Sequence, residues 1–221
     1  KNQIIPTTEA ESHFWTAGFK HVAGLDEAGR GAWAGPVYAA AVILPQTLTD
    51  LDGVRDSKKL TPRQREAIID RILDVAIAVG VGYAESQEID TRGIVPATRL
   101  AMCRALDALP IAAQALVIDY LRLPEVNLPQ RAFPYADAHS LAVATAGIVA
   151  KVKRDHWMME VAECTYTGYG FAQHKGYGTR QHREALDKLG VTPIHRRSFR
   201  PVAMATNAPE ALHFQYPLPK E

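Results

Sequence analysis

Cysteine is scarce in this sequence, with only Cys103 and Cys164 among 221 residues. Two cysteines in a chain of this length do not form a disulfide framework, so we expect a reducing cytoplasmic setting, with a single disulfide as the alternative. Long apolar runs are also absent, since none approaches the roughly eighteen residues of a membrane span. Residues 1–6 lack the apolar segment of a signal peptide. We therefore expect a cytoplasmic protein with no membrane partner.

No sign of charge dominates, because 25 Lys and Arg stand against 24 Asp and Glu. The distribution is more informative, since residues 171–200 concentrate cations and histidines. This basic segment holds Lys175, Arg180, Arg183, Lys188, Arg196, Arg197 and Arg200, with His174, His182 and His195, against Glu184 and Asp187. A solvated basic surface is the common interpretation. In a chain with a strongly acidic site elsewhere, the segment also indicates a surface that grips a polyanion.

Internal repeats and long linkers are missing too, and 47% hydrophobic residues suffice for one α/β domain with a small appendage. The residue patterns predict a mixed sheet flanked by helices. Strands are expected at 20–26, 35–44, 75–84, 115–119 and 132–136, and helices at 8–18, from Pro62, and at 91–109, 140–163 and 179–189. The first two strands should form an antiparallel hairpin. Thr61 and Gln64 predict a capping box for the helix from Pro62.

The most informative stretch that is present is Asp26-Glu27-Ala28-Gly29-Arg30-Gly31. Two carboxylates at the tip of a buried strand are costly unless something pairs with them. A divalent cation is the usual partner for such acids, and phosphate is the usual substrate for such a cation. The arginine and the glycine amides lie where a phosphate or sugar could approach the backbone. The alternative is a turn with solvated acids.

Three of the predicted strands end in acids, namely Asp26 with Glu27, Asp119, and Asp137. If these strands are parallel neighbours, their ends converge on one edge of the sheet. Oxygen ligands alone favour Mg²⁺ or Mn²⁺, and no CxxC or HExxH pattern argues for zinc. For Asp119 or Asp137 singly, a turn or helix cap is an equal alternative. Asp155 could support such a site from behind, but we favour an ion pair with Lys151.

Seven segments give the chain a specific resemblance, which covers about Phe14 to Pro201. They are Val22–Gly31 around DEAGRG, Asp56–Pro62, Ile118-Asp119, Ala136–Ser140, Ala150–Asp155, His174–Thr179 and His195–Phe199. In this order they resemble type 2 ribonuclease H, ribonuclease HII. The resemblance implies the ribonuclease H fold, with a mixed five-stranded sheet flanked by helices and a small helical C-terminal extension. We expect a catalytic domain at 1–167, a basic helical extension at 168–201 that completes the substrate cleft, and a partly disordered tail at 202–221.

The resemblance also implies an activity. The family hydrolyses the RNA strand of RNA/DNA hybrids and incises 5′ of single ribonucleotides in duplex DNA, by two-metal-ion catalysis that leaves 3′-OH and 5′-phosphate ends. Matched by position, the metal-binding and catalytic acids are Asp26, Glu27, Asp119 and Asp137, with Mg²⁺ or Mn²⁺ as cofactor. The substrate-binding residues are Gly29, Arg30 and Gly31 at the ribose 2′-hydroxyl, Ser57 and Lys58 at phosphate, and Tyr177 as a junction sensor. The alternatives without a functional role are that Tyr177 is a loop aromatic packed on the core and that Lys58 is a solvated lysine.

Three residues depart from the family pattern. Tyr120 and Ala136 stand where glycine is usual, and His139 stands where lysine is common. None removes a carboxylate, so we expect activity. The rival functions are another ribonuclease H-like metal nuclease and a module that binds hybrids without cutting them. We expect a monomer. A sliding clamp stays open as a partner but is unsupported, because His213-Phe214-Gln215-Tyr216 shows no clear clamp-binding motif.

Overall fold

A mixed five-stranded sheet forms the centre of the computed structural model, which describes residues 5–47, 51, 53–54 and 60–205. The strand order is β3-β2-β1-β4-β5. The strands are β1 (Val22–Ala28), β2 (Val37–Ile43), β3 (Ala78–Ala84), β4 (Ala115–Asp119) and β5 (Gln130–Phe133). Strand β1 pairs antiparallel with β2 and parallel with β4. The mixed sheet and the expected hairpin are both confirmed.

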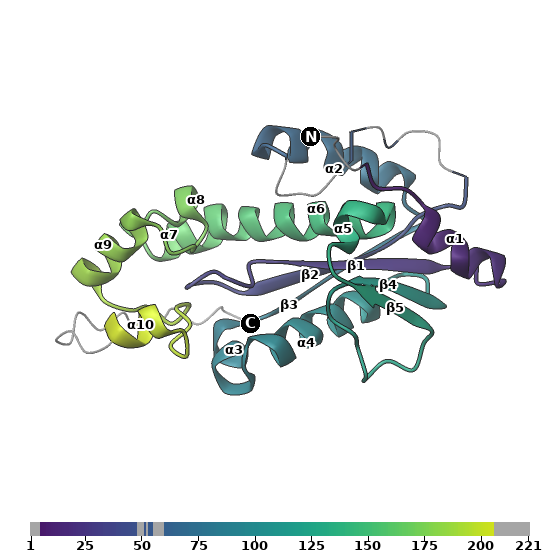
Figure 1. The fold of residues 1–221 in the computed structure, drawn as a ribbon. Helices are drawn as coiled ribbons and strands as arrows, with labels where there is room; N and C mark the ends of the chain where they lie inside the picture. The colour runs from purple at the N-terminus through teal and green to yellow at the C-terminus, as the bar shows by residue number, and fades with distance from the viewer. Residues whose placement is uncertain (1–4, 48–50, 52, 55–59, 206–221) are drawn as a thin grey trace, which may run out of the picture.

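Helices cover both faces of this sheet (Figure 1). The longer helices are α2 (Pro62–Val75), α4 (Ile94–Asp107), α6 (Leu141–His156) and α9 (Arg180–Leu189). The shorter ones are α1 (Glu9–Thr16), α3 (Ser86–Arg92), α5 (Ala136–His139), α7 (Glu163–Thr165), α8 (Phe171–His174) and α10 (Arg200–Ala205). Helices α6 and α2 lie over one face, and α3 and α4 lie over the other. In the described part of the chain, no helix is long and apolar enough to cross a membrane.

Alternation along the strands sends side chains into two separate cores. Ala23 and Leu25 of β1 pack into the core under α4, whereas Ala28 packs into the core under α6. Gly24 allows a close approach of α6, because a Cβ there would overlap the α6 backbone at Ala142 and Val143. Helix α6 is therefore seated directly on β1, the strand that carries Asp26 and Glu27.

The predicted capping box is present at the start of α2. The Thr61 side chain accepts from the Gln64 N–H at 3.3 Å, and the Gln64 side chain accepts from the Thr61 N–H at 2.8 Å. The helix predicted at 91–109 is α4, which begins three residues later than expected because Gly93, with a positive φ of 83°, separates it from α3. A second capping box, Glu85 with Glu88, starts α3.

The predicted final strand at 132–136 is wrong in its bounds. Strand β5 ends at Phe133, and Asp137 lies in the short helix α5. Tyr135 turns the chain out of the strand by adopting a left-handed conformation with φ of 61°. Asp137 thus reaches the sheet edge from a helix and not from a strand end.

The C-terminal part of the chain gathers at one end of the sheet (Figure 1). Helix α6 continues into a π-helix, Trp157–Ala162, and then into α7, in place of the single helix predicted at 140–163. The predicted helix capped by Thr179 is α9, whose cap accepts from the His182 N–H at 3.2 Å. A separate apolar cluster around Met158 and Phe171 joins this part to the rest. Residues 202–205 belong to α10, and the rest of the predicted tail lies outside the described residues.

Candidate active site

Asp26 is a nearly fully buried carboxylate on β1, with 4% of its surface exposed. Alternation along the strand points it to the α6 face, where Gly147 makes room for it. A Cβ at Gly147 would overlap the Asp26 carboxylate oxygen Oδ2. The other oxygen, Oδ1, accepts from the Glu27 N–H at 2.7 Å. The Asp26 side chain therefore lies between β1 and α6, in space that the glycine at position 147 leaves free.

Asp119 and Asp137 approach the same place from two other elements. Asp119 is the last residue of β4, the parallel neighbour of β1. Its Oδ1 accepts from the Ala136 N–H at 2.8 Å, which joins the end of β4 to the start of α5. Helix α6 is capped by Ser140, whose hydroxyl accepts from the Val143 N–H at 3.1 Å, so Asp137 does not serve as its cap.

The carboxylate edge, formed by Asp26, Glu27, Asp119 and Asp137, is electrostatically unfavourable by itself. Burial raises the pKa of Asp26 well above its usual range, and the negative charges of Glu27, Asp119 and Asp137 raise it further. In the described residues, no three His, Cys, Asp or Glu side chains are already arranged to hold a metal ion. A set of carboxylate oxygens that repel one another nevertheless fits a hard divalent cation, which offsets their charge.

The Gly29–Gly31 loop follows directly after β1. Gly29 requires its glycine, because its φ is 89° and a Cβ there would overlap the Arg154 side chain. Gly31 is exposed, with open space where a Cβ would lie. Arg30 Nη1 lies 3.7 Å from Glu27 Oε1, and its Cζ lies 5.7 Å from the centroid of the Tyr120 ring. The loop thus presents backbone beside the carboxylate edge.

Tyr120, one of the departures from the family pattern, is mostly exposed. It adopts a left-handed conformation with φ of 59°, which costs a residue with a Cβ about 1 kcal/mol or more. Glycine would fit there without strain. The tyrosine instead places an aromatic ring against Arg30.

Two buried arginines hold the backbone on both sides of Gly31, from Arg30 to Pro36. Arg196 donates from Nη1 to the Arg30 carbonyl at 2.9 Å and from Nε to the Gly35 carbonyl at 3.0 Å. Arg154 donates from Nε to the Pro36 carbonyl at 2.9 Å. The expectation that Arg196 belongs to a solvated basic surface is wrong, since its side chain is fully buried. Burial lowers the pKa of Arg196 to about 9.

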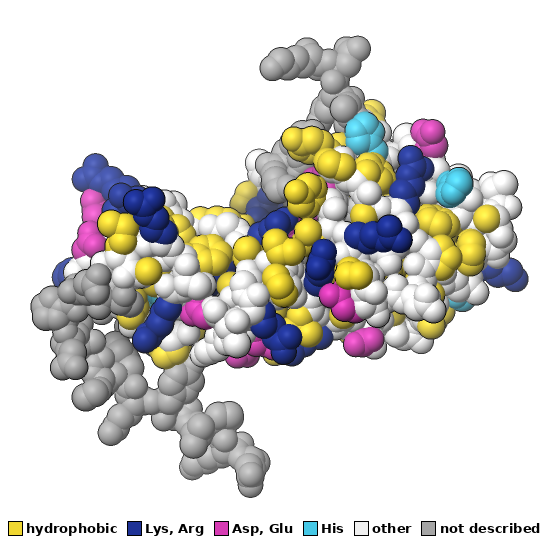
Figure 2. Space-filling view, turned by 60° about the horizontal axis from the view of Figure 1, so that its bottom comes forward, with side chains coloured by type: hydrophobic (Ala, Val, Ile, Leu, Met, Phe, Trp, Pro, Cys, Tyr) yellow, Lys and Arg dark blue, Asp and Glu magenta, His cyan; other side chains and the backbone are white. Residues whose placement is uncertain are grey.

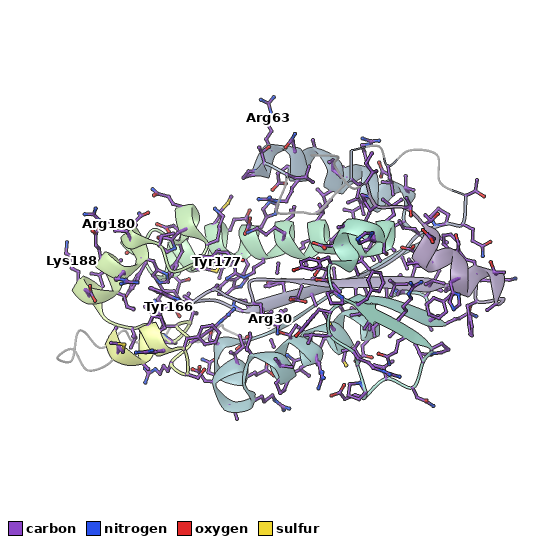
Figure 3. The ribbon with its side chains drawn as sticks, viewed as in Figure 1. Arg30, Arg63, Tyr166, Tyr177, Arg180 and Lys188 are labelled. Atoms are coloured by element: carbon purple, nitrogen blue, oxygen red, sulfur yellow. The ribbon has the colours of Figure 1, made fainter. Side chains whose placement is uncertain are left out.

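Tyr177 is half-buried and lies between α6 and the C-terminal helices (Figure 3). Its ring faces two cations, with Lys151 Nζ and Arg154 Cζ each 5.3 Å from the ring centroid. Its carbonyl accepts from His182 Nδ1 at 3.0 Å. Lys151 also pairs with Asp155 at 2.7 Å, as predicted.

The three histidines of the basic segment form a buried histidine cluster, not a charged surface. His195 Nδ1 accepts from the Thr192 N–H at 2.9 Å, so its Nε2–H donates to His182 Nε2 at 3.1 Å. His182 then donates from Nδ1 to Tyr177. The His174 ring stacks on His182 with centroids 4.4 Å apart. Burial lowers the pKa of His182 to about 4 and of His195 to about 3.

The rest of the basic segment divides by exposure. Arg180, Arg183, Lys188, Arg197 and Arg200 are exposed, whereas Lys175 is half-buried. Arg180 and Lys188 project from the outer side of α9, away from the sheet (Figure 3). On the face in Figure 2, cationic side chains are scattered among apolar and neutral ones. Ser57 and Lys58 lie outside the described residues, as do His213 to Tyr216.

This sheet order, with acids at the ends of its central parallel strands, defines the class of ribonuclease H-like nucleases. The family model described as Ribonuclease HII matches residues 23–202, so the chain belongs to the ribonuclease HII family. It is therefore an endoribonuclease of the ribonuclease H type that acts on RNA/DNA substrates and depends on a divalent metal.

A curated relative and two solved structures show how far the similarity extends. Ribonuclease HII of Dehalococcoides mccartyi is 49% identical over 201 residues, which cover 90% of this chain and 95% of that protein. The crystal structure of ribonuclease H2 from Pyrococcus horikoshii matches with a TM-score of 0.70 and 27% identity, over 84% of this chain and 97% of that one. Bst-RNase HIII in complex with Mn²⁺ shares the fold, with a TM-score of 0.65, 18% identity, and 84% and 68% coverage.

Sequence reasoning brought the four acids together correctly but missed the groups behind them. Arg154 lay in a segment that carried the family resemblance, yet nothing in the local pattern showed that it is buried. The histidine cluster was visible only as composition, because its members are joined through the fold of residues 169–196. Gly147 lay in a small-residue helix face, and its partner Asp26 is distant in sequence.

Proposed function

We propose that the carboxylate edge holds the Mg²⁺ or Mn²⁺ ions of the reaction and that the chain incises duplex DNA on the 5′ side of a single ribonucleotide. The observation that carries this proposal is the burial of Asp26 among three further acids, which raise its pKa by repulsion. Divalent cations bound by such carboxylates supply the charge that stabilises a phosphodiester transition state and its leaving oxygen. Asp26, Glu27, Asp119 and Asp137 would hold them there.

The neighbouring loop supplies recognition of the sugar. Only the 2′-hydroxyl distinguishes RNA from DNA at one nucleotide. Gly31 leaves backbone groups that such a hydroxyl can approach, which the open space at that position supports, and Gly29 allows the φ of 89° at the start of the loop. Arg30 stands between Glu27 and Tyr120, where its guanidinium can reach a sugar or phosphate. The exposed part of the Tyr177 side chain would pack on the adjoining deoxynucleotide.

The test is an incision assay on a labelled duplex with one embedded ribonucleotide, with Mg²⁺ or with a chelator. We expect a nick on the 5′ side of the ribonucleotide only with the metal, with 3′-OH and 5′-phosphate ends. The same duplex with a deoxynucleotide at that position should stay intact. A 2′,3′-cyclic phosphate would mean that the 2′-hydroxyl attacks, which would contradict the proposed role of the acids. Binding without a nick would favour the non-cleaving module.

A matched pair of variants ties the nick to the site. Asp137→Asn should slow single-turnover incision at least about a hundredfold, as expected for a group that supports transition-state charge, while duplex binding changes little. The control is Asp74→Asn, which removes an exposed acid on α2. Equal rates for the two variants would remove Asp137 from the proposed site.

A further inference from the structure

We propose that Arg154 is a positioning residue that fixes the Tyr177 ring relative to the Gly29–Gly31 loop and thereby sets the preference for a lone ribonucleotide over a continuous hybrid. The inference rests on the proposed function, because it assigns a structural origin to the selectivity of that same site. Arg154 itself does not touch substrate. It acts through the two segments that do.

The guanidinium of Arg154 joins two separate parts of the chain by hydrogen bonds. Its Nε and Nη2 donate to the carbonyls of Pro36 and Ala34, at 2.9 and 3.1 Å. Its Nη1 donates to the carbonyl of Lys175, at 3.0 Å. The first two acceptors lie in the segment after Gly31, and the third lies two residues before Tyr177. All three donors therefore tie the sugar-reading loop to the Tyr177 segment.

Direct packing adds two further contacts to the same side chain. A Cβ at Gly29 would overlap the Arg154 Nε, so the loop backbone rests against the guanidinium. On its other side, Cζ lies 5.3 Å from the centroid of the Tyr177 ring. A cation at this distance from an aromatic face attracts it. One planar group thus touches both elements that the proposed function assigns to substrate reading.

The chemistry of the position requires arginine. The side chain is fully buried, and its described hydrogen bonds go to backbone carbonyls, which are neutral. A planar fork with five fixed donors can serve three carbonyls in different directions, whereas a lysine ammonium is a point charge that cannot span them. An apolar side chain there would leave the three carbonyls without a donor, so stability also favours arginine. The contacts with Gly29 and Tyr177 give it a further role.

The experiment measures kcat/KM on a lone-ribonucleotide duplex and on a continuous hybrid, and uses their ratio as the preference. Arg154→Lys should lower this ratio about tenfold or more through kcat, because the ring is displaced from its working geometry. Tyr177→Leu should lower it too. The double variant should be no worse than the worse single variant, because both changes remove the same arrangement. Arg104→Lys is the control. Arg104 also donates to a backbone carbonyl, that of Tyr83, but it lies on α4 and contacts neither Gly29 nor Tyr177 in the described hydrogen bonds.

Several results would overturn the inference. They are equal slowing of both substrates by Arg154→Lys, an unchanged ratio, or losses that multiply in the double variant. If Arg154→Lys does not fold, as judged by circular dichroism, Tyr177→Leu still decides, because an unchanged ratio there leaves Arg154 nothing to position. Failure of the unsubstituted protein to nick the lone ribonucleotide would instead overturn the proposed function.

Discussion

In the carboxylate edge, burial acts on groups that repel one another, whereas in the histidine cluster it acts on groups that hydrogen-bond one another. The first raises the pKa of Asp26, and the second lowers the pKa of His182 and of His195. The acids are thus held in a geometry that favours an added positive charge. The histidines are neutral, and the ring nitrogens of His182 and His195 form hydrogen bonds to other groups of the protein. The comparison therefore separates a region whose charges favour an added cation from a region whose internal hydrogen bonds stabilise the fold.

The largest expected effect comes from removing one charge from the carboxylate edge. Asp26→Asn should lower the incision rate about a thousandfold or more, because a central ligand charge is lost. Without metal, the same change should raise the melting temperature by about 2–4 °C, the shift that corresponds to roughly 1 kcal/mol of relieved repulsion in a chain of this size. The incision rate is measured under single-turnover conditions with Mg²⁺, and the melting temperature is measured on the same preparation with a chelator. A lower melting temperature would show that the buried carboxylate stabilises the metal-free fold.

The second effect is on stability as a function of pH, and it has opposite signs in the two regions. His182 and His195 bind protons more weakly in the folded state, so the unfolded chain takes up more protons below about pH 6.5. Their stabilisation is complete above that pH and is lost as the pH falls toward about 4 and about 3. Each histidine adds a slope of about 1.4 kcal/mol per pH unit. Asp26 has a raised folded pKa, so its contribution is complete in acid and is lost as the pH rises through that value.

A variant isolates the histidine contribution. His182→Gln should flatten the dependence of the unfolding free energy on pH between about 6.5 and about 5 by about one histidine's slope, whatever its effect at neutral pH. The measurement is urea unfolding across this range in the presence of a chelator. His139→Gln, which removes an exposed histidine outside the cluster, is the matched control. An unchanged slope in His182→Gln would mean that this histidine titrates alike in both states.

The smallest effect concerns the exposed arginines of the basic segment. Arg183→Ala or Arg197→Ala should weaken binding to all duplexes alike and reduce the salt slope by about 1 for each phosphate that is no longer neutralised. The preference for a ribonucleotide should survive. Lys20→Ala is the control, because Lys20 precedes β1, at the strand end opposite the acids. A changed preference at constant affinity would show that these cations read the sugar.

Local sequence signals predicted the elements that depend on neighbours in the chain. The capping box at Thr61 and the buried strands at 115–119 and 35–44 are examples. The signals failed where a distant residue decides the outcome. Arg196 reads as part of a basic patch, yet its side chain is buried and two of its nitrogens donate to the carbonyls of Arg30 and Gly35. Asp137 reads as a strand end, yet the turn at Tyr135 and the bond from Ala136 to Asp119 start a helix there.

Helix α6 has a consequence for where the chain would cut. Gly147, which receives Asp26, and Arg154, which rests against Gly29, lie about two turns apart on the same face of this helix. The rise per residue makes that separation about 10 Å. A continuous helix resists both stretching and compression, so it holds a constant distance between the acids proposed to bind the metal and the loop proposed to read the sugar. Under the proposed function, the length of this helix would set the distance from the ribonucleotide to the broken bond, which a loop of the same span could not hold constant.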